Sequence, residues 1–429
     1  KTMVMRPAAS APPPFTSAGP TRSGHAPIVA GAASGSASIK VLNGAAPYDK
    51  ELWSLVASLG WLGAATPEAD GGLVSQHAIF GGTEVLTARF TGEGPGIFVI
   101  RAKSFPAEPS GGAGWVIAGM DVDAGHLIVP AMTGVVFDKT HPGVNAYLEY
   151  PNTWHAQMIV YEAAAGSALL YSTDAQLYSK SLRISTRGRS TIDVGIHTQA
   201  VAPWPSSTSV PTIEWRLKAY SGTWRVAAQT YKDWLLANRP PVSNANHPWV
   251  SSIRNVVGVT TTDTSQLTSL AAQLAPSQTL LYLIDWRSVP YDYNYPDYTP
   301  KAGIAAFITA AHTLGFKVML HTDYVGVSPG NPDYASMQPY QVRTTDGSQL
   351  MGWRWDWPVS EPTRFAFINP AASAYRSLWI ARVTAAVNAL SPDALHLDIS
   401  APTYNDGNGV IEGRTYAQGS VQFHQDIIS

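Results

Sequence analysis

PDALHLDIS, residues 392–400, is the stretch that decides the fold of this chain. Apolar and polar residues alternate in it, as in a short strand, and the strand ends on the carboxylate of Asp398. Three earlier stretches have the same strand character, namely residues 256–260, 280–286 and 317–324. Helical patterns separate the four strands, and strands that alternate with helices predict a parallel sheet.

The helical patterns cover residues 265–274, 302–314, 371–390 and 416–428. Residues 247–429 therefore hold four βα units, which we interpret as the first half of a TIM (β/α)8 barrel. Half a barrel leaves two open sheet edges and an uncovered apolar face. We therefore expect further polypeptide, covalently joined or not, to complete it. In such a barrel the chemistry lies at the carboxyl ends of the strands.

The region before the barrel has a different pattern. Residues 46–220 contain short alternating runs separated by Gly, Pro, Asn and Asp, which predicts an antiparallel β-sandwich; clear examples are residues 84–90, 96–100, 126–129 and 168–172. Apolar residues at helical spacing over 223–236 predict a linking helix within residues 221–246. Residues 1–45 are rich in Pro, Ala, Gly and Ser, a composition typical of an extended arm or linker.

The composition narrows the range of partners. The formal net charge is −2 and no basic block is present, which argues against nucleic acid or an anionic membrane as a partner. The chain has no cysteine, which excludes disulfides, and no apolar run long enough to predict a membrane span. It has 14 Trp and 19 Tyr with only 14% charged residues, which suits neutral ligands such as sugars, or equally a β-rich core. We expect an exported bacterial protein, secreted, on the cell surface or in the periplasm, without a cofactor.

Asp398 is the leading candidate for a catalytic residue. Glycoside hydrolysis with retention needs one carboxylate that attacks the anomeric carbon and a second carboxyl that protonates the leaving oxygen. The attacking group must be held rigidly, which the end of a buried strand provides. His396 lies two residues earlier, shares the same side of the strand and is a candidate substrate-binding residue. The alternative is that Asp398 caps a loop or accepts a backbone N–H.

Acidic and aromatic residues also follow the second and third predicted strands. Asp285 is placed to bind substrate hydroxyls beside Trp286 as a stacking wall, or alternatively to pair with Arg287. His321 and Asp323 end the third strand and are candidate substrate-binding residues. A His and an acid two residues apart also occur in metal sites, but nothing else here has metal-site spacing, so we expect no metal.

Two aromatic clusters lie in the predicted loops, at residues 291–298 and 353–357. Trp353 and Trp355 are candidate platforms for sugar rings, and self-packing of the loops is the alternative. Glu412, in the loop after the fourth strand, is a weak candidate for the second carboxyl and equally suits a solvated loop. Otherwise the general acid follows a later strand, beyond Ser429. Residues 404–409 have the composition of a turn.

Several runs carry a family resemblance. A β-sandwich, a helix of sequence GTWRVAAQTYKDW (222–234) and a barrel whose fourth strand ends on Asp398 together resemble retaining α-glycosidases, namely endo-α-N-acetylgalactosaminidase-like, α-galactosidase-like and family 31-like enzymes. NYPDYTP (294–300), GFKVMLH (315–321), YPNTWHAQ (150–157) and LYSTD (170–174) are similar to a bacterial glycosidase-like family with a domain of unknown function. The resemblance spans roughly residues 75–429. It implies that Asp398 is the nucleophile, that Asp285 contacts substrate and that the acid/base follows a later strand.

Three functions remain open from the sequence. The first is a retaining glycoside hydrolase that acts on α-linked oligo- or polysaccharides. The second is a non-catalytic carbohydrate-binding or structural assembly protein built on a degenerate glycosidase fold. The third is a metal-dependent barrel enzyme with Asp285, Asp323 and Asp398 as oxygen ligands. A second carboxyl about 5 Å from Asp398 favours retention, about 6.5–9.5 Å favours inversion, and none favours a binding protein.

Overall fold

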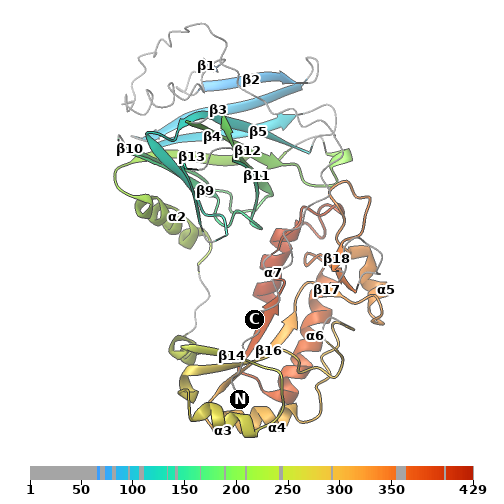
Figure 1. The fold of residues 1–429 in the computed structure, drawn as a ribbon. Helices are drawn as coiled ribbons and strands as arrows, with labels where there is room; N and C mark the ends of the chain where they lie inside the picture. Colours follow the sequence, from blue (N-terminus) through green and yellow to red (C-terminus); the bar gives the residue numbers. More distant parts are fainter. Residues whose placement is uncertain are drawn as a thin grey trace.

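The computed structural model describes the backbone of the strands between residues 65 and 105, and residues 111–428 apart from 133, 141–143, 165, 188–189, 208–209, 241–244, 291–292, 354–363 and 401. The predicted arm over residues 1–45 lies outside the described residues. Figure 1 shows two parts, a β-rich part at the top and a part of mixed strands and helices at the bottom.

The β-rich part contains two antiparallel sheets. The larger has the order β1-β2-β3-β4-β13-β10-β9-β6-β7 and the smaller the order β5-β12-β11-β8. The larger sheet consists of β1 (Ala65–Pro67), β2 (Leu73–Ile79), β3 (Glu84–Gly94), β4 (Ile97–Phe105), β13 (Ile213–Tyr220), β10 (Gly166–Ser172), β9 (Met158–Ala163), β6 (Gly125–Val129) and β7 (Val135–Phe137). The smaller consists of β5 (Gly112–Asp121), β12 (Thr191–Gln199), β11 (Lys180–Arg187) and β8 (Asn145–Tyr150). The strands predicted at 84–90, 96–100, 126–129 and 168–172 are confirmed as β3, β4, β6 and β10.

One apolar core joins the two sheets. In β13, Ile213, Trp215 and Leu217 are buried while the residues between them are partly exposed, the alternation of a strand with one face on a core. The same cluster contains Ile184 of β11 and Ile196 of β12, from the smaller sheet. The core therefore draws on side chains from both sheets.

A buried ion pair shapes one turn of the β-rich part. Lys180, in β11, is fully buried, and its Nζ donates to Asp174 Oδ2 at 2.8 Å, to Gln157 Oε1 at 2.7 Å and to the Tyr178 carbonyl at 2.9 Å. Burial lowers the pKa of Lys180 to about 8, against the opposing effect of the Asp174 carboxylate. Asp174 also accepts the backbone N–H groups of Gln176 and Tyr178, so the pair fixes the turn before β11.

Replacing Lys180 with Met is expected to lower the free energy of unfolding of the β-rich part by about 3–5 kcal/mol, because it leaves the Asp174 charge buried without its cation. The double variant Lys180→Met/Asp174→Leu removes both charges and should recover most of that loss. Urea unfolding followed by circular dichroism measures both. A single variant within about 1 kcal/mol of the wild type would contradict a structural role for the pair.

A helix covers the outer face of the larger sheet. Helix α2 (Trp224–Asn238) confirms the predicted linking helix. It buries Ala227 and Tyr231 against Val160 of β9 and Leu169 of β10. This helix is the last element before the second part of the chain.

The second part contains a four-stranded parallel sheet with the order β14-β15-β16-β20. Its strands are β14 (Asn255–Val259), β15 (Thr279–Leu283), β16 (Lys317–Asp323) and β20 (Ala394–Asp398). Helices α3 (Ser265–Ala271), α4 (Ile304–Thr313), α6 (Ser373–Leu390) and α7 (Tyr416–Ile428) follow these strands in turn. All four predicted βα units are therefore confirmed as elements, with ends that differ by a few residues.

Smaller elements complete the described structure. A three-stranded sheet of order β17-β19-β18 lies between β16 and α6 in the sequence. It consists of β17 (Gly326–Val327), β18 (Gly352–Trp353) and β19 (Phe365–Phe367), and the short helix α5 (Tyr334–Met337) lies between the first two. Single 3-10 turns are η1 (Trp204–Ser206), η2 (Pro248–Ser252), η3 (Pro276–Gln278) and η4 (Gln338–Tyr340). No helix among the described residues is long and apolar enough to cross a membrane.

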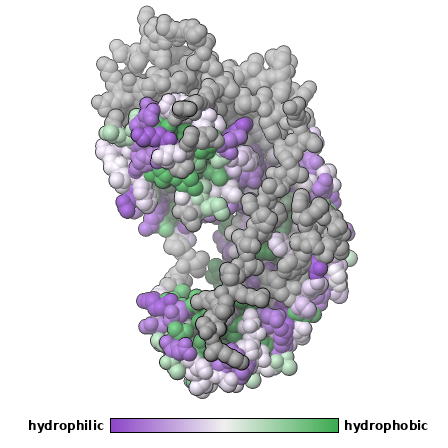
Figure 2. Space-filling model, viewed as in Figure 1, coloured by the Kyte–Doolittle hydropathy of each residue, from purple (hydrophilic) through white to green (hydrophobic). Residues whose placement is uncertain are grey.

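Two asparagine side chains join the loop after β20 to the β-rich part. Asn152 donates to the Thr403 carbonyl and accepts the Thr403 N–H, both at 2.8 Å. Asn405 accepts the Ala202 N–H at 2.9 Å and donates to the Ala200 carbonyl at 2.7 Å. A small pocket lined by residues of both parts, among them Gln199, Ala200, Asn405 and Tyr416, lies beside this junction. Figure 2 shows an opening between the two parts. The β-rich part therefore holds the loop that follows Asp398.

Candidate active site at the ends of the parallel strands

The parallel pairing of β16 and β20 brings two acids together. In the register of these strands Asp323 lies beside Asp398, and His321 beside His396. Carboxyl ends of parallel strands meet at one edge of a sheet, and residues two apart share a face. The two histidines therefore form one row across the strands and the two aspartates form the next. His396 and Asp398 share one side of β20, as the sequence predicted.

His321 lies between the two carboxylates. Its Nε2 is 3.9 Å from Asp323 Oδ1 and 4.0 Å from Asp398 Oδ2. One ring nitrogen and one oxygen of each carboxylate all lie within 4.8 Å of one another. The side chain of Asp398 is 37% exposed, whereas those of His321 and Asp323 are almost completely buried. Asp398 is thus the member of the cluster that an external molecule reaches, and the other two form the wall behind it.

The backbone holds Asp398 in a fixed orientation. The Ile399 N–H donates to Asp398 Oδ1 at 2.9 Å, so the backbone contact that the sequence left open as an alternative is present. Ile399 has a φ of 56°, in the left-handed region that a β-branched residue rarely adopts. Such strained residues concentrate at functional sites, because the surrounding structure must hold them there. The contact and a catalytic role are compatible, since it engages one carboxylate oxygen.

Buried rings hold the backbone beneath the cluster. The Asp323 carbonyl accepts Tyr298 Oη at 3.0 Å and Trp379 Nε1 at 2.7 Å. Trp286 Nε1 donates to the His321 carbonyl at 2.7 Å, and its ring stacks on Tyr298. Only 1% of Trp286 is exposed. The predicted role of Trp286 as a stacking wall for sugars is therefore wrong, because the ring is enclosed in the core and orients β16 instead.

Asp285 lies at the rim, two residues after β15 ends at Leu283. Its carboxylate pairs with Lys301 at 2.5 Å, and both side chains are about two-fifths exposed. Arg287, the predicted alternative partner, is buried, with its guanidinium 3.5 Å from the centre of the Tyr295 ring. The pairing of Asp285 with Arg287 is thus wrong. Asp285 remains accessible, as a group that contacts ligand must be.

The aromatic loop residues mainly pack against one another. Tyr295 and Tyr298 are buried in the core of this part, which confirms self-packing for them. Trp353 is half-buried in β18, where it pairs with Phe365 of β19. Trp355 lies outside the described residues.

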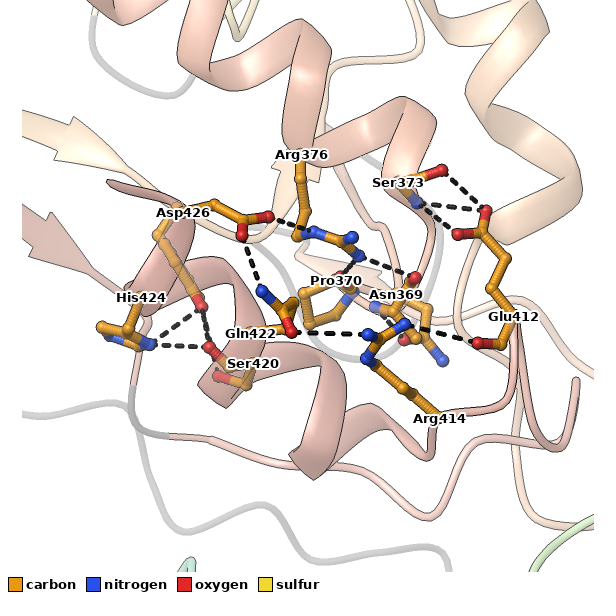
Figure 3. Close-up of polar contacts among 12 residues, drawn as sticks. Asn369, Pro370, Ser373, Arg376, Glu412, Arg414, Ser420, Gln422, His424 and Asp426 are labelled. Carbon is orange, nitrogen blue, oxygen red and sulfur yellow. Dashed lines mark hydrogen bonds and ion pairs between the residues drawn. The ribbon is translucent and has the colours of Figure 1, made fainter. Parts of the chain in front are cut away.

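Glu412 caps a helix. Its carboxylate accepts the Ser373 N–H at 3.1 and 3.2 Å and the Ser373 hydroxyl at 3.0 Å, at the first turn of α6 (Figure 3). An anion there satisfies an N–H that has no partner within the helix and complements the helix dipole. Glu412 and Gly413 both have positive φ, so the chain turns tightly at this point. Its observed contacts give Glu412 a structural role in place of the weakly predicted acid/base role.

The same close-up shows a side-chain contact between α6 and α7 (Figure 3). Arg376 donates to Asp426 Oδ2 at 2.7 Å and to the Pro370 carbonyl at 2.9 Å. Gln422 donates to the other oxygen of Asp426 at 2.7 Å. The contact between Arg376 and Asp426 joins α7 to α6, and Gln422, within α7, orients the Asp426 carboxylate.

Burial sets the protonation of the rings near Asp398. Burial lowers the pKa of His321 to about 4, with a smaller opposing effect from the Asp398 carboxylate and smaller lowering effects from His396 and Arg287. His321 is therefore neutral at neutral pH. Burial, with the charges of Asp398 and Asp323, raises the pKa of Tyr282 to about 12, so this phenol keeps its proton.

Sequence reasoning missed three residues that shape this site. Tyr282, Lys301 and Trp379 contact His321, Asp285 and the Asp323 carbonyl respectively. Only Tyr282 left a usable signal, because it stands on the strand beside β16 in the middle of an apolar run. The partners of Lys301 and Trp379 are 16 and 56 residues away, distances that no local pattern reports.

The spacing of His321, Asp323 and Asp398 would also suit a divalent cation. The metal-dependent alternative, however, required Asp285 with Asp323 and Asp398. In the structure Asp285 is paired with the ammonium group of Lys301. The predicted set of three aspartates therefore does not assemble.

Comparison with known proteins relates this chain to several solved structures by its fold. A model for a domain of unknown function (DUF6259) matches residues 211–406. No curated protein matches the chain. Among solved structures, the α-N-acetylgalactosaminidase NagBb of Bifidobacterium bifidum in complex with GalNAc matches with a TM-score of 0.68 at 13% identity, over 85% of this chain and 65% of that one. Its ligand-free form matches with a TM-score of 0.63 at 14% identity, over 85% and 67%.

A GH36 α-galactosidase of Geobacillus stearothermophilus also matches, with a TM-score of 0.49 at 12% identity over 83% of this chain and 52% of that one. The present chain thus spans about two thirds of the length of the N-acetylgalactosaminidase in its GalNAc complex, 65%. The predicted resemblance is confirmed at the level of the fold: a β-rich domain is followed by part of an α-glycosidase-like domain.

Proposed function

We propose that this protein is a retaining glycoside hydrolase that acts on α-linked glycans, with Asp398 as the nucleophile. One observation carries the proposal: in an α-glycosidase-like fold, Asp398 is the accessible carboxylate at the end of the fourth parallel strand. The Ile399 N–H donates to Asp398 Oδ1 and so fixes the orientation of the carboxylate.

The proposed reaction has two steps. In the first, an Asp398 oxygen attacks the anomeric carbon while the bond to the leaving oxygen breaks, and that oxygen takes a proton from a general acid. In the second, water attacks the same carbon, gives its proton to the same group and releases the Asp398 carboxylate. Two displacements at one carbon retain its configuration.

Asp323 is an unsuitable general acid, although its carboxylate lies within 4.8 Å of Asp398. It is 2% exposed and stands on the adjacent strand, behind His321. A leaving group on the far side of the sugar is out of its reach. We assign Asp323 and His321 to the support of Asp398, and Asp285 to contact with substrate hydroxyls at the rim.

The proposal extends to the architecture. The four βα units would form half of a (β/α)8 barrel, preceded by a β-sandwich. Among the described residues, β14 and β20 each have a neighbour on one side only, so both edges of the sheet are open to further strands. Further polypeptide would complete the barrel and supply the general acid from a later strand. An extracytoplasmic location suits an enzyme for oligo- or polysaccharides.

Hydrolysis of a panel of p-nitrophenyl glycosides tests this proposal. We expect release of nitrophenol from α-N-acetylgalactosaminide or α-galactoside and none from the matching β-anomers. Proton NMR of the early product should show the α-anomer first. A β-anomer as first product would contradict retention. Binding of the sugars without hydrolysis would favour the non-catalytic alternative, and loss of activity with EDTA would favour the metal-dependent one.

A further inference from the structure

One phenol in the site lies between two imidazoles. The Tyr282 hydroxyl is 2.5 Å from His321 Nδ1 and 3.1 Å from His396 Nδ1. The two imidazole rings stack, with centroids 5.3 Å apart and planes inclined by 22°. Three strands, β15, β16 and β20, each contribute one ring to this row. The two histidines therefore share a single hydroxyl group.

A hydroxyl between two ring nitrogens carries one proton, so it donates to one nitrogen and accepts from the other. Of the two Nδ1 atoms, one must then be bare and the other must carry a hydrogen. Each neutral imidazole holds one N–H, so the choice at Nδ1 also decides Nε2. The tautomers of His321 and His396 are therefore opposite.

The carboxylates decide which tautomer each histidine adopts. Nε2 of His321 faces Asp323 Oδ1 at 3.9 Å and Asp398 Oδ2 at 4.0 Å. A bare Nε2 would turn its lone pair toward two anionic oxygens, whereas an N–H there is attracted by both. His321 then accepts the Tyr282 proton at Nδ1, the shorter of the two contacts. His396 must carry its hydrogen on Nδ1 and donate it to the Tyr282 oxygen.

We infer that Tyr282 is a positioning residue that locks His321 in the Nε2–H tautomer and His396 in the Nδ1–H tautomer. The Nε2–H group of His321 then points toward Asp398 and stabilises its ionised form. The ionised carboxylate is the form that attacks in the first step of the proposed reaction and is released in the second. The groups that face His321 from the surrounding elements are Tyr282, His396, Asp323, Asp398 and Arg287. The tautomer lock rests on these distances and on the charge of the two carboxylates, while its effect on catalysis rests on the proposed function.

Nuclear magnetic resonance of ¹⁵N-histidine-labelled protein tests the lock without any substrate. Long-range ¹H–¹⁵N spectra distinguish the two neutral tautomers, and His321→Gln and His396→Gln variants assign the signals. We expect His396 in the Nδ1–H form, the rarer one for imidazole in water, and His321 in the Nε2–H form. In Tyr282→Phe the ring remains but the hydroxyl is lost, and His396 should change to the Nε2–H form.

A matched control removes a phenol beside another histidine. Tyr324 Oη lies 3.1 Å from His424 Nδ1 and donates to the Ser420 carbonyl of α7 at 3.0 Å. Tyr324→Phe should change the His424 signals and leave those of His321 and His396 as in the wild type. On a hydrolysed nitrophenyl glycoside, Tyr282→Phe should lower kcat about 10-fold with little change in KM, the effect expected from the loss of one orienting hydrogen bond.

The outcomes separate the lock from the reaction. His396 in the Nε2–H form in the wild type would overturn the lock whether or not the protein hydrolyses glycosides. An unchanged kcat in Tyr282→Phe, with the expected change in the spectra, would overturn its role in catalysis. Correct tautomers in a protein that cleaves no glycoside would support the lock and contradict the proposed function.

Discussion

Asp398→Asn is expected to lower kcat by about 10⁴-fold or more, the scale seen when a covalent nucleophile is removed. The amide cannot attack the anomeric carbon, so the glycosyl intermediate does not form. Asn has the same shape and still accepts the Ile399 N–H, and 37% of the side chain is exposed. The fold should therefore persist, as judged by the thermal unfolding midpoint and far-UV circular dichroism.

Asp393→Asn is the matched control, at the opposite end of the same strand. Burial alone would raise the pKa of Asp393, but hydrogen bonds from Lys317, the Val318 N–H and His312 hold it below its ordinary value. A depressed pKa stabilises the fold at pH values above the unfolded-state pKa, and this contribution is lost as the pH falls through the folded-state value. The control should therefore lose stability at neutral pH, less so in acid, and keep its kcat.

Either of two results would contradict the assignment of Asp398 as the nucleophile. An Asp398→Asn protein that retains more than about a tenth of wild-type kcat has another nucleophile. An Asp398→Asn protein that unfolds would show a structural role instead. The kinetic and thermal measurements together distinguish the two cases.

Trp379→Ala is expected to lower the free energy of unfolding by about 3–5 kcal/mol, the range for removal of a large buried ring. Trp379 is fully buried in α6, and its ring meets Tyr298, Tyr324 and Phe423 edge-on. Its Nε1 also donates to the Asp323 carbonyl at 2.7 Å. The substitution leaves a cavity between α6, α7 and β16 and frees the end of the strand that carries Asp323.

Trp379→Phe separates the ring from its N–H. Phe keeps most of the packing and loses only the donor to the Asp323 carbonyl, which Tyr298 still binds. We expect a cost of about 1–3 kcal/mol, mainly from the shape change and the lost hydrogen bond. Urea unfolding of both variants tests this order. Equal losses, or a loss below about 1 kcal/mol for Trp379→Ala, would contradict the role of this ring in fixing β16.

The sequence was most informative where structure follows local pattern. Four strands, four following helices and the linking helix could be predicted because each has its own periodicity and ends at Gly, Pro or a polar residue. The placement of His321, Asp323, His396 and Asp398 at one edge followed from parallel pairing alone. The resemblance to α-glycosidases was based on this order of elements together with sequence runs such as GTWRVAAQTYKDW (222–234).

What could not be predicted depends on contacts between distant residues. Trp286 had the position of a rim residue, but its ring turns inward to stack on Tyr298. Asp285 forms its ion pair with Lys301 and not with the neighbouring Arg287, because Arg287 is buried against Tyr295. Glu412 caps a helix that begins 39 residues earlier. Side-chain direction and packing, rather than strand order, decide each of these cases.

The loop after β20 shows the same limit. Residues 404–409 had the composition of a turn, and part of the loop is one. The carboxylate of Asp406, however, accepts the Arg343 N–H at 2.9 Å and the Asn369 amide at 2.7 Å, and burial raises its pKa. A buried acid with partners more than thirty residues away leaves no trace in local composition.

The central claim is that Asp398 forms the covalent intermediate. Its most direct test is to incubate the protein with a fluorinated α-galactosyl fluoride, which forms a glycosyl ester but releases it slowly. Peptic digestion and tandem mass spectrometry then locate the added sugar. We predict the label on Asp398 in the wild type and none in Asp398→Asn. A label on another carboxyl, in a protein that hydrolyses α-glycosides, would contradict the account.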